Sequence, residues 1–187
     1  NLQDQLADRD LPLVARALDR GFRFTVLKGR SNYLCRRRYA RLLAGELGNV
    51  SPREREGLLA LIRWAEQTTT GDVEEQRQFN RRWHAKIWNL ISAEASGCAG
   101  SACSLSGECF HQRARRRAMV SHVVVINHAL FYSDVSADAW SRSAAAPMIF
   151  DEAHHLESCG HRCLCVTVDT NRLRRFLDMC NDLAARL

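Results

Sequence analysis

Lysine is nearly absent from this chain. Lys28 and Lys86 are its only lysines among 27 basic residues, so arginine carries almost all of the net charge of +6. Guanidinium groups contact phosphates in a bidentate way and stack on bases. This composition suits a polyanionic partner such as nucleic acid, although a single arginine cluster is equally typical of a solvated basic face.

Two further absences narrow the class of protein. No apolar run approaches the roughly 20 residues of a membrane span, and the polar start NLQDQLADRD does not resemble a signal peptide. We therefore expect no membrane partner and a reducing compartment, in which disulfides are rare.

The arginines are clustered. They lie at 36–38, at 81–82 and at 113 with 115–117, and each cluster flanks a cysteine or an aromatic residue. This arrangement favours nucleic-acid binding over a purely solvated surface.

Apolar runs predict three strands. Phe22–Leu27 leads into a turn at Gly29, and Val123–Ile126 is a β-branched run typical of a strand buried on both faces. A third run, PMIF at 147–150, ends directly in DEAHHLE. Helical patterns flank these runs, which indicates an α/β fold with a parallel sheet.

The clearest helix is expected at 52–67, with Ser51 as the N-cap and Pro52 in the first position. Further helices are expected within 79–94, at 111–120 and at 172–187, and the opening segment to residue 19 is helical or mixed. We expect the aromatic residues of the 79–94 segment to lie in the core.

Three cysteines, Cys98, Cys103 and Cys109, follow a C-x4-C-x5-C spacing in a glycine- and serine-rich segment, and Cys35 stands far upstream. Structural zinc sites usually show closer pairs, whereas a cubane cluster needs four converging thiolates that wider loops can supply. Spacing alone leaves an iron–sulfur cluster, a zinc ion and unrelated thiols open.

The later cysteines are less informative. Cys159, Cys163 and Cys165 accompany His161 in CGHRCLC, which could in principle hold a metal, but in an extended run Cys163 and Cys165 would share a face and crowd each other. Cys180 lies in a helical pattern and is most simply a small buried hydrophobe.

Asp151 and Glu152 are adjacent carboxylates at the end of an apolar run. Many nucleoside triphosphatases hold magnesium and polarise the attacking water with such a pair at the carboxyl edge of a sheet. Acids near a helix N-terminus are the alternative interpretation.

Four motifs occur in order: KGRSNYLC, the cysteine triplet followed by RARRRA, VVVINHALF, and DEAHHLE. Together they resemble the DinG branch of the XPD-like superfamily 2 helicases. The resemblance implies part of a RecA-like parallel-sheet motor domain with an inserted, mainly helical [4Fe–4S] domain. It also implies ATP-dependent 5′ to 3′ unwinding of DNA, associated with repair or replication.

The resemblance assigns roles position by position. It implies that Asp151, Glu152 and His154 are the DEAH-box residues, of which the two acids act on ATP and Mg²⁺ and His154 couples the nucleotide site to DNA. Asn127 and His128 match the family's NH after the strand, and we expect these two residues to be structural. The implied cluster ligands are Cys35, Cys98, Cys103 and Cys109. The implied DNA-contacting residues are Lys28, Arg30, Asn32, Tyr33, Arg36, Arg37 and Arg38.

On the same basis, residues 1–27 and 119–158 are expected to belong to the first RecA-like domain, 28–118 to the cluster domain, and 159–187 to the start of a helical arch domain. We expect a monomer in the bacterial cytosol that binds single-stranded and fork-type DNA.

The chain departs from the family because it has no G-x-x-x-x-G-K-[ST] phosphate loop. The loop is expected upstream, and this segment alone is not expected to hydrolyse ATP. Two other classes stay open: a non-enzymatic nucleic-acid-binding module with a structural zinc at the four cysteines, and an iron–sulfur electron carrier.

Overall fold

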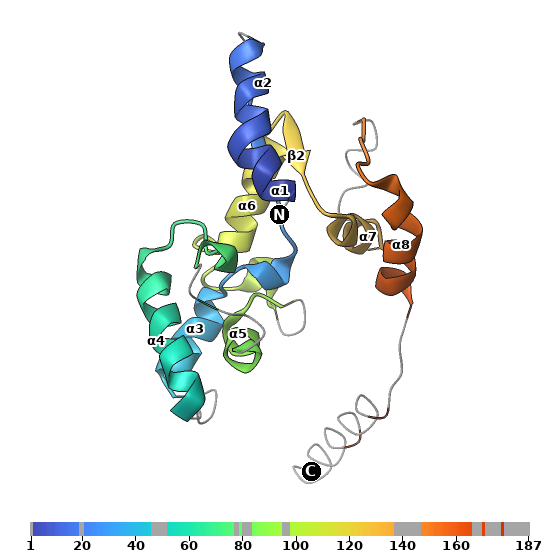
Figure 1. The fold of residues 1–187 in the computed structure, drawn as a ribbon. Helices are drawn as coiled ribbons and strands as arrows, with labels where there is room; N and C mark the ends of the chain where they lie inside the picture. Colours follow the sequence, from blue (N-terminus) through green and yellow to red (C-terminus); the bar gives the residue numbers. More distant parts are fainter. Residues whose placement is uncertain are drawn as a thin grey trace. The chain divides into compact units, whose positions relative to one another are not determined.

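The computed structural model describes residues 2–18, 21–45, 52–76, 79, 84–94, 98–136, 147–165, 170 and 177. The chain forms two compact units, residues 1–127 and 128–187, and each is described by itself. Figure 1 shows their elements along the chain.

The first unit opens with α1 (Leu2–Gln5), the π-helical turn η1 (Leu6–Asp10) and α2 (Leu11–Ala17), which confirms the helical prediction for this segment. Strand β1 (Phe24–Val26) then pairs with β2 (Val123–Val125) in parallel. The predicted parallel pairing is thus confirmed.

The expected burial of the second strand on both faces is wrong. All residues of β1 and β2 are only half-buried. Among the described residues the sheet has just these two strands, so a strand in it lacks the neighbours that cover the centre of a larger sheet.

The main hydrophobic cluster of the first unit runs from Tyr33 to Phe110 among the described residues. It is enclosed by α3 (Arg36–Leu43), α4 (Pro52–Gln67) and α5 (Ala85–Ile91). Pro52 begins α4 as predicted, because its missing N–H and fixed φ suit a first helical position.

Apolar residues of α4 and α5 meet in this core. Leu61 is fully buried on α4, and the rings of Trp64 and Trp88 lie with centroids 6.3 Å apart. Trp88 is 2% exposed, which fits the expectation that the aromatic residues are core. Trp83 lies outside the described residues.

Two isolated antiparallel bridges bring distant segments to the start of α3. Tyr33 pairs with Asp72, and Leu34 pairs with Ser92. The N–H of Cys35 donates to the carbonyl of Ile91 at 2.8 Å. Cys35 is therefore held between the segment that follows α4 and the end of α5.

The cysteine-rich segment contains only turns and the short 3-10 helix η4 (Gly100–Ala102), as its composition predicted. It ends at α6 (Phe110–Met119), which leads to β2. Two other 3-10 turns, η2 (Arg30–Asn32) and η3 (Val73–Glu75), lie in the described part of this unit.

The second unit contains α7 (His128–Ser136), the 3-10 turn η6 (Ala153–His155) and α8 (Leu156–Leu164). The Tyr132 hydroxyl donates to the carbonyl of Leu156 at 3.0 Å, joining α7 to α8. Cys180 and most of the helix expected at 172–187 lie outside the described residues.

The strand predicted at 147–150 is wrong. These residues form neither helix nor strand, and Ile149 is 97% exposed. No strand pairs with them in the described part of the second unit, and an extended segment without a partner leaves its backbone groups to water. No helix among the described residues is long and apolar enough to cross a membrane.

Candidate functional site

One pocket in the first unit is lined by all four cysteines of the predicted ligand set. Cys35 precedes α3 and Cys109 precedes α6, while Cys98 and Cys103 lie on the loop between α5 and α6. Helix N-termini carry partial positive charge that favours thiolates. The fold therefore brings Cys35 into one pocket with three cysteines that lie more than sixty positions later in the chain.

The thiols of this pocket are free. Cys98 is exposed, and Cys35, Cys103 and Cys109 are half-buried. The backbone N–H of Gly100 donates to the sulfur of Cys98 at 3.4 Å. Across the described ranges, no three His, Cys, Asp or Glu side chains are arranged closely enough to hold a metal ion as they stand.

Basic side chains share the lining of this pocket. They come from the η2 turn and the first turn of α3: Arg30, Arg36, Arg37 and Arg38. Four positive charges beside four thiols favour negatively charged occupants, either thiolates or a phosphate-bearing ligand at the rim.

Two of these arginines are also anchored to the protein. The guanidinium of Arg36 lies 4.8 Å from the ring centre of Phe110 and 3.7 Å from a carboxylate oxygen of Glu108. Arg38 donates to the carbonyl of Asn89 at 3.0 Å and pairs with Glu94 at 3.4 Å. The arginine cluster therefore also joins α3 to the end of α5.

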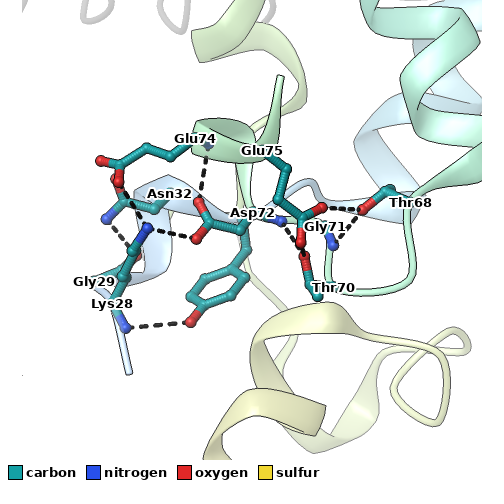
Figure 2. A network of polar contacts seen from close by, with 10 residues as sticks. Lys28, Gly29, Asn32, Thr68, Thr70, Gly71, Asp72, Glu74 and Glu75 are labelled. Atoms are coloured by element: carbon teal, nitrogen blue, oxygen red, sulfur yellow. Dashed lines mark hydrogen bonds and ion pairs between the residues drawn. The ribbon is translucent and has the colours of Figure 1, made fainter. Parts of the chain in front are cut away.

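Lys28 is not on the surface. Its side chain forms ion pairs with Asp72 and Glu74, each with an N–O distance of 2.7 Å, and the residue is 7% exposed. Figure 2 shows the ammonium group between the two carboxylates. The backbone N–H of Lys28 donates to the Tyr33 hydroxyl at 3.2 Å. This placement gives both residues a structural role in the basic turn.

Burial by itself would lower the pKa of Lys28. The hydrogen bonds and charges of Asp72 and Glu74 outweigh that effect and raise the pKa above its ordinary value. Sequence reasoning missed both acids. In the sequence they are marked only by the acidic segment DVEE, which could pair with a buried cation. The cation, Lys28, lies more than forty residues before that segment.

The acidic loop is itself well ordered by hydrogen bonds (Figure 2). The hydroxyls of Thr68 and Thr70 donate to Glu75 at 3.0 and 2.5 Å, and the N–H of Gly71 donates to Thr68 at 2.8 Å. Asn32 donates to the carbonyl of Gly29 at 3.0 Å, which closes the turn after β1.

His111 also lines the cysteine pocket and was missed. Burial, followed by the charges of Arg30 and Arg115, lowers its pKa to about 4. Its ring meets Tyr33 edge-on at 5.6 Å. At neutral pH the side chain is therefore an uncharged imidazole in a basic environment.

The predicted DEAH-box residues lie together in the second unit. Asp151, Glu152 and His154 are exposed, and a carboxylate oxygen of Glu152 lies 3.3 Å from the imidazole of His154. Glu152 has φ 50°, a left-handed conformation that is unusual for a residue other than glycine. His128 contacts the carbonyl of Asp151 at 3.1 Å, which fits its predicted structural role.

The chain is 35% identical over 187 residues to the ATP-dependent DNA helicase YoaA of Escherichia coli (strain K12), covering 97% of the chain and 28% of that protein. It is 33% identical to YoaA of Haemophilus influenzae, again covering 28% of the relative. It is 35% identical over 176 residues to the ATP-dependent helicase DinG of Mycobacterium tuberculosis (strain ATCC 25177 / H37Ra), with 83% of the chain and 26% of the relative covered. The chain corresponds to one segment of the DinG-type proteins.

The predicted family is thereby confirmed, and the segment spans less than a third of the length of these curated relatives. No family model matches the chain. The segment carries both the pocket with four cysteines and the sequence DEAH at 151–154, in separate compact units.

The second group of cysteines in the DinG-type segment differs from the sequence expectation. Cys159 and Cys163 lie on α8 rather than in an extended run, and their sulfurs are 3.9 Å apart. Cys165 follows the helix and is exposed. Desolvation and the adjacent Cys159 thiol raise the pKa of Cys163.

Proposed function

We propose that the whole protein is an ATP-dependent DNA helicase, and that this segment supplies its iron–sulfur site and its DEAH box. The observation that carries the proposal is the identity of 35% to an ATP-dependent DNA helicase along 97% of the chain. ATP-driven 5′ to 3′ unwinding would require the remainder of the protein, including a phosphate loop.

The cluster ligands in this proposal are Cys35, Cys98, Cys103 and Cys109. Their common pocket supports the assignment, since four thiols are the donor set of a [4Fe–4S] cluster. The cluster would cross-link the two ends of the segment that contains most of the main hydrophobic cluster of the first unit. Closing such a long loop costs chain entropy, which metal–thiolate bonds would offset.

DNA contact is proposed for the arginines at the pocket, Arg30 and Arg36 to Arg38. They are half-buried and share the pocket lining, where guanidinium groups can meet phosphate oxygens. Lys28, Asn32 and Tyr33 would act indirectly, because their polar groups already hold the basic turn in place.

Nucleotide chemistry is proposed for the DEAH box. Asp151 would hold Mg²⁺, Glu152 would polarise the attacking water, and His154 would link the nucleotide site to DNA binding. All three side chains are exposed, which leaves them accessible to a nucleotide. The isolated segment is not expected to hydrolyse ATP, because its sequence contains no phosphate loop.

We also propose that residues 1–27 and 119–158 belong to the RecA-like domain, 28–118 to the cluster domain and 159–187 to the arch domain. The same proposal includes a monomeric state, a bacterial cytosolic location and binding of single-stranded and fork-type DNA. A main hydrophobic cluster formed by residues 33–110 supports an inserted domain at 28–118.

Metal analysis of anaerobically purified protein tests the cluster. We expect about four irons and four acid-labile sulfides per chain. Cys103→Ser should lose iron and helical content together, whereas Cys165→Ser, outside the pocket, should retain both. One zinc without sulfide would instead support the zinc-binding module, and an unchanged iron count in Cys103→Ser would contradict the ligand assignment.

Salt-dependent binding of single-stranded DNA tests the arginine surface. Replacement of Arg36, Arg37 and Arg38 by alanine should weaken binding and reduce the salt slope by up to about 2, at roughly 0.7 per lost phosphate contact. The double replacement Arg55→Ala and Arg63→Ala, at exposed positions of α4, is the control, and the two variants are compared per arginine removed. Equal loss per arginine in both variants would indicate nonspecific attraction and contradict the proposed surface.

A further inference from the structure

Helix α8 carries a pair of thiols that neither the cluster pocket nor the DEAH box uses. Cys159 and Cys163 are four residues apart and therefore lie on one face of the helix. Their sulfur atoms are 3.9 Å apart. Cys159 is 7% exposed, whereas Cys163 is exposed to solvent.

The separation of the two sulfurs suits a bridging metal ion. Two thiolates bound to one zinc-sized ion at about 2.3 Å in tetrahedral geometry lie about 3.8 Å apart. The observed 3.9 Å already matches that value. A disulfide would require the sulfurs to approach to about 2.0 Å, which a helix of fixed geometry opposes.

The helix that carries the pair is firmly placed on its neighbour within the second unit. Gly160 is buried, and a Cβ there would lie 3.0 Å from the ring of Tyr132. The Tyr132 hydroxyl also donates to the carbonyl of Leu156 at 3.0 Å. These contacts hold the part of α8 that carries Cys159 against α7.

We propose that Cys159 and Cys163 together bind one thiophilic metal ion of the Zn²⁺ or Cd²⁺ class. Soft thiolate donors select such ions over magnesium or calcium. The ion enters from the side of the exposed Cys163. Solvent completes its coordination, since within the described part of the chain no third His, Cys, Asp or Glu is grouped with the pair.

Cadmium titration of the anaerobically purified chain tests this site, followed by thiolate-to-metal charge-transfer absorption and by bound metal after desalting. The wild type should bind one more cadmium ion per chain than Cys163→Ser. Cys165→Ser is the matched control, and it should bind as much cadmium as the wild type. Iron content should be equal in all three proteins, which separates this site from the proposed cluster.

Cys163→Ser is the preferred variant because its side chain is exposed, whereas replacement of the buried Cys159 could impair folding. Equal cadmium binding by the wild type and Cys163→Ser would overturn the proposal. The proposal would also be overturned if the wild type bound no extra cadmium and its mass were two hydrogen atoms below the mass of the reduced chain. If Cys163→Ser did not show this mass loss, the pair would be assigned to a disulfide.

Discussion

Replacement of Lys28 by methionine removes the cation from the centre of the polar network that joins the end of β1 to the loop after α4. The side chains of Lys28 and Asp72 are 9% and 16% exposed, so both charges are largely shielded from water. Removing one partner of a buried ion pair costs about 3–5 kcal/mol. Because Glu74 is 40% exposed and can be resolvated, we expect a loss of about 2–4 kcal/mol in the free energy of unfolding.

The two acids should respond unequally. Asp72→Asn removes the more buried charge but can still accept the backbone N–H of Glu74, which now donates to Asp72 at 3.1 Å. We expect it to cost more than Glu74→Gln, for which an exposed pair predicts less than about 1 kcal/mol. Urea unfolding followed by circular dichroism measures all three variants.

Lys86→Met is the matched control, since Lys86 is the other lysine and is exposed on α5. Its stability should stay within about 0.5 kcal/mol of the wild type. A Lys28→Met protein as stable as the wild type, or a greater loss in Glu74→Gln than in Asp72→Asn, would refute this account of the network.

The raised pKa of Lys28 sets the pH range of this stabilisation. The contribution is fully present below the unfolded-state pKa of about 10.4 and is lost as pH rises through the higher folded-state value. The stability difference between the wild type and Lys28→Met should therefore be constant from neutral pH to about 10 and should shrink above that.

Two further predictions concern the packing around the cysteine pocket. Gly71→Ala should destabilise the first unit by more than about 2 kcal/mol in urea unfolding, because Gly71 has φ 70° and an added Cβ would lie 2.3 Å from the ring of Phe110. Gly107→Ala is the control and should be nearly neutral, because an added Cβ there would meet no atom within 4 Å. Similar losses of stability in the two variants would contradict this packing. In the metal-free protein His111 has a folded-state pKa of about 4, so the unfolded state binds its proton first and stability falls as pH decreases from 6.5 toward 4. The loss is about 3 kcal/mol, and His111→Gln should flatten the curve over that interval; a variant with the wild-type pH profile would show that the histidine does not titrate in this way.

Local sequence patterns determined much of the secondary structure. Pro52 and the apolar positions after it predicted α4, and the β-branched run at 123–125 predicted β2, because helix starts and strand propensity depend on neighbouring residues. The four ordered motifs identified the family, which the relatives confirm. The same local rules failed at 147–150, since a strand also needs a partner that no local pattern supplies.

Tertiary structure alone decided which distant residues meet. Cys35 lines one pocket with the three later cysteines because Leu34 pairs with Ser92 and the N–H of Cys35 bonds to Ile91. Lys28 became a buried ion-pair partner because Asp72 and Glu74 fold back onto it. Cys159 and Cys163 became a pair only because this segment is helical. Such contacts depend on chain reversals across tens of residues, whereas a local pattern registers only its immediate neighbours.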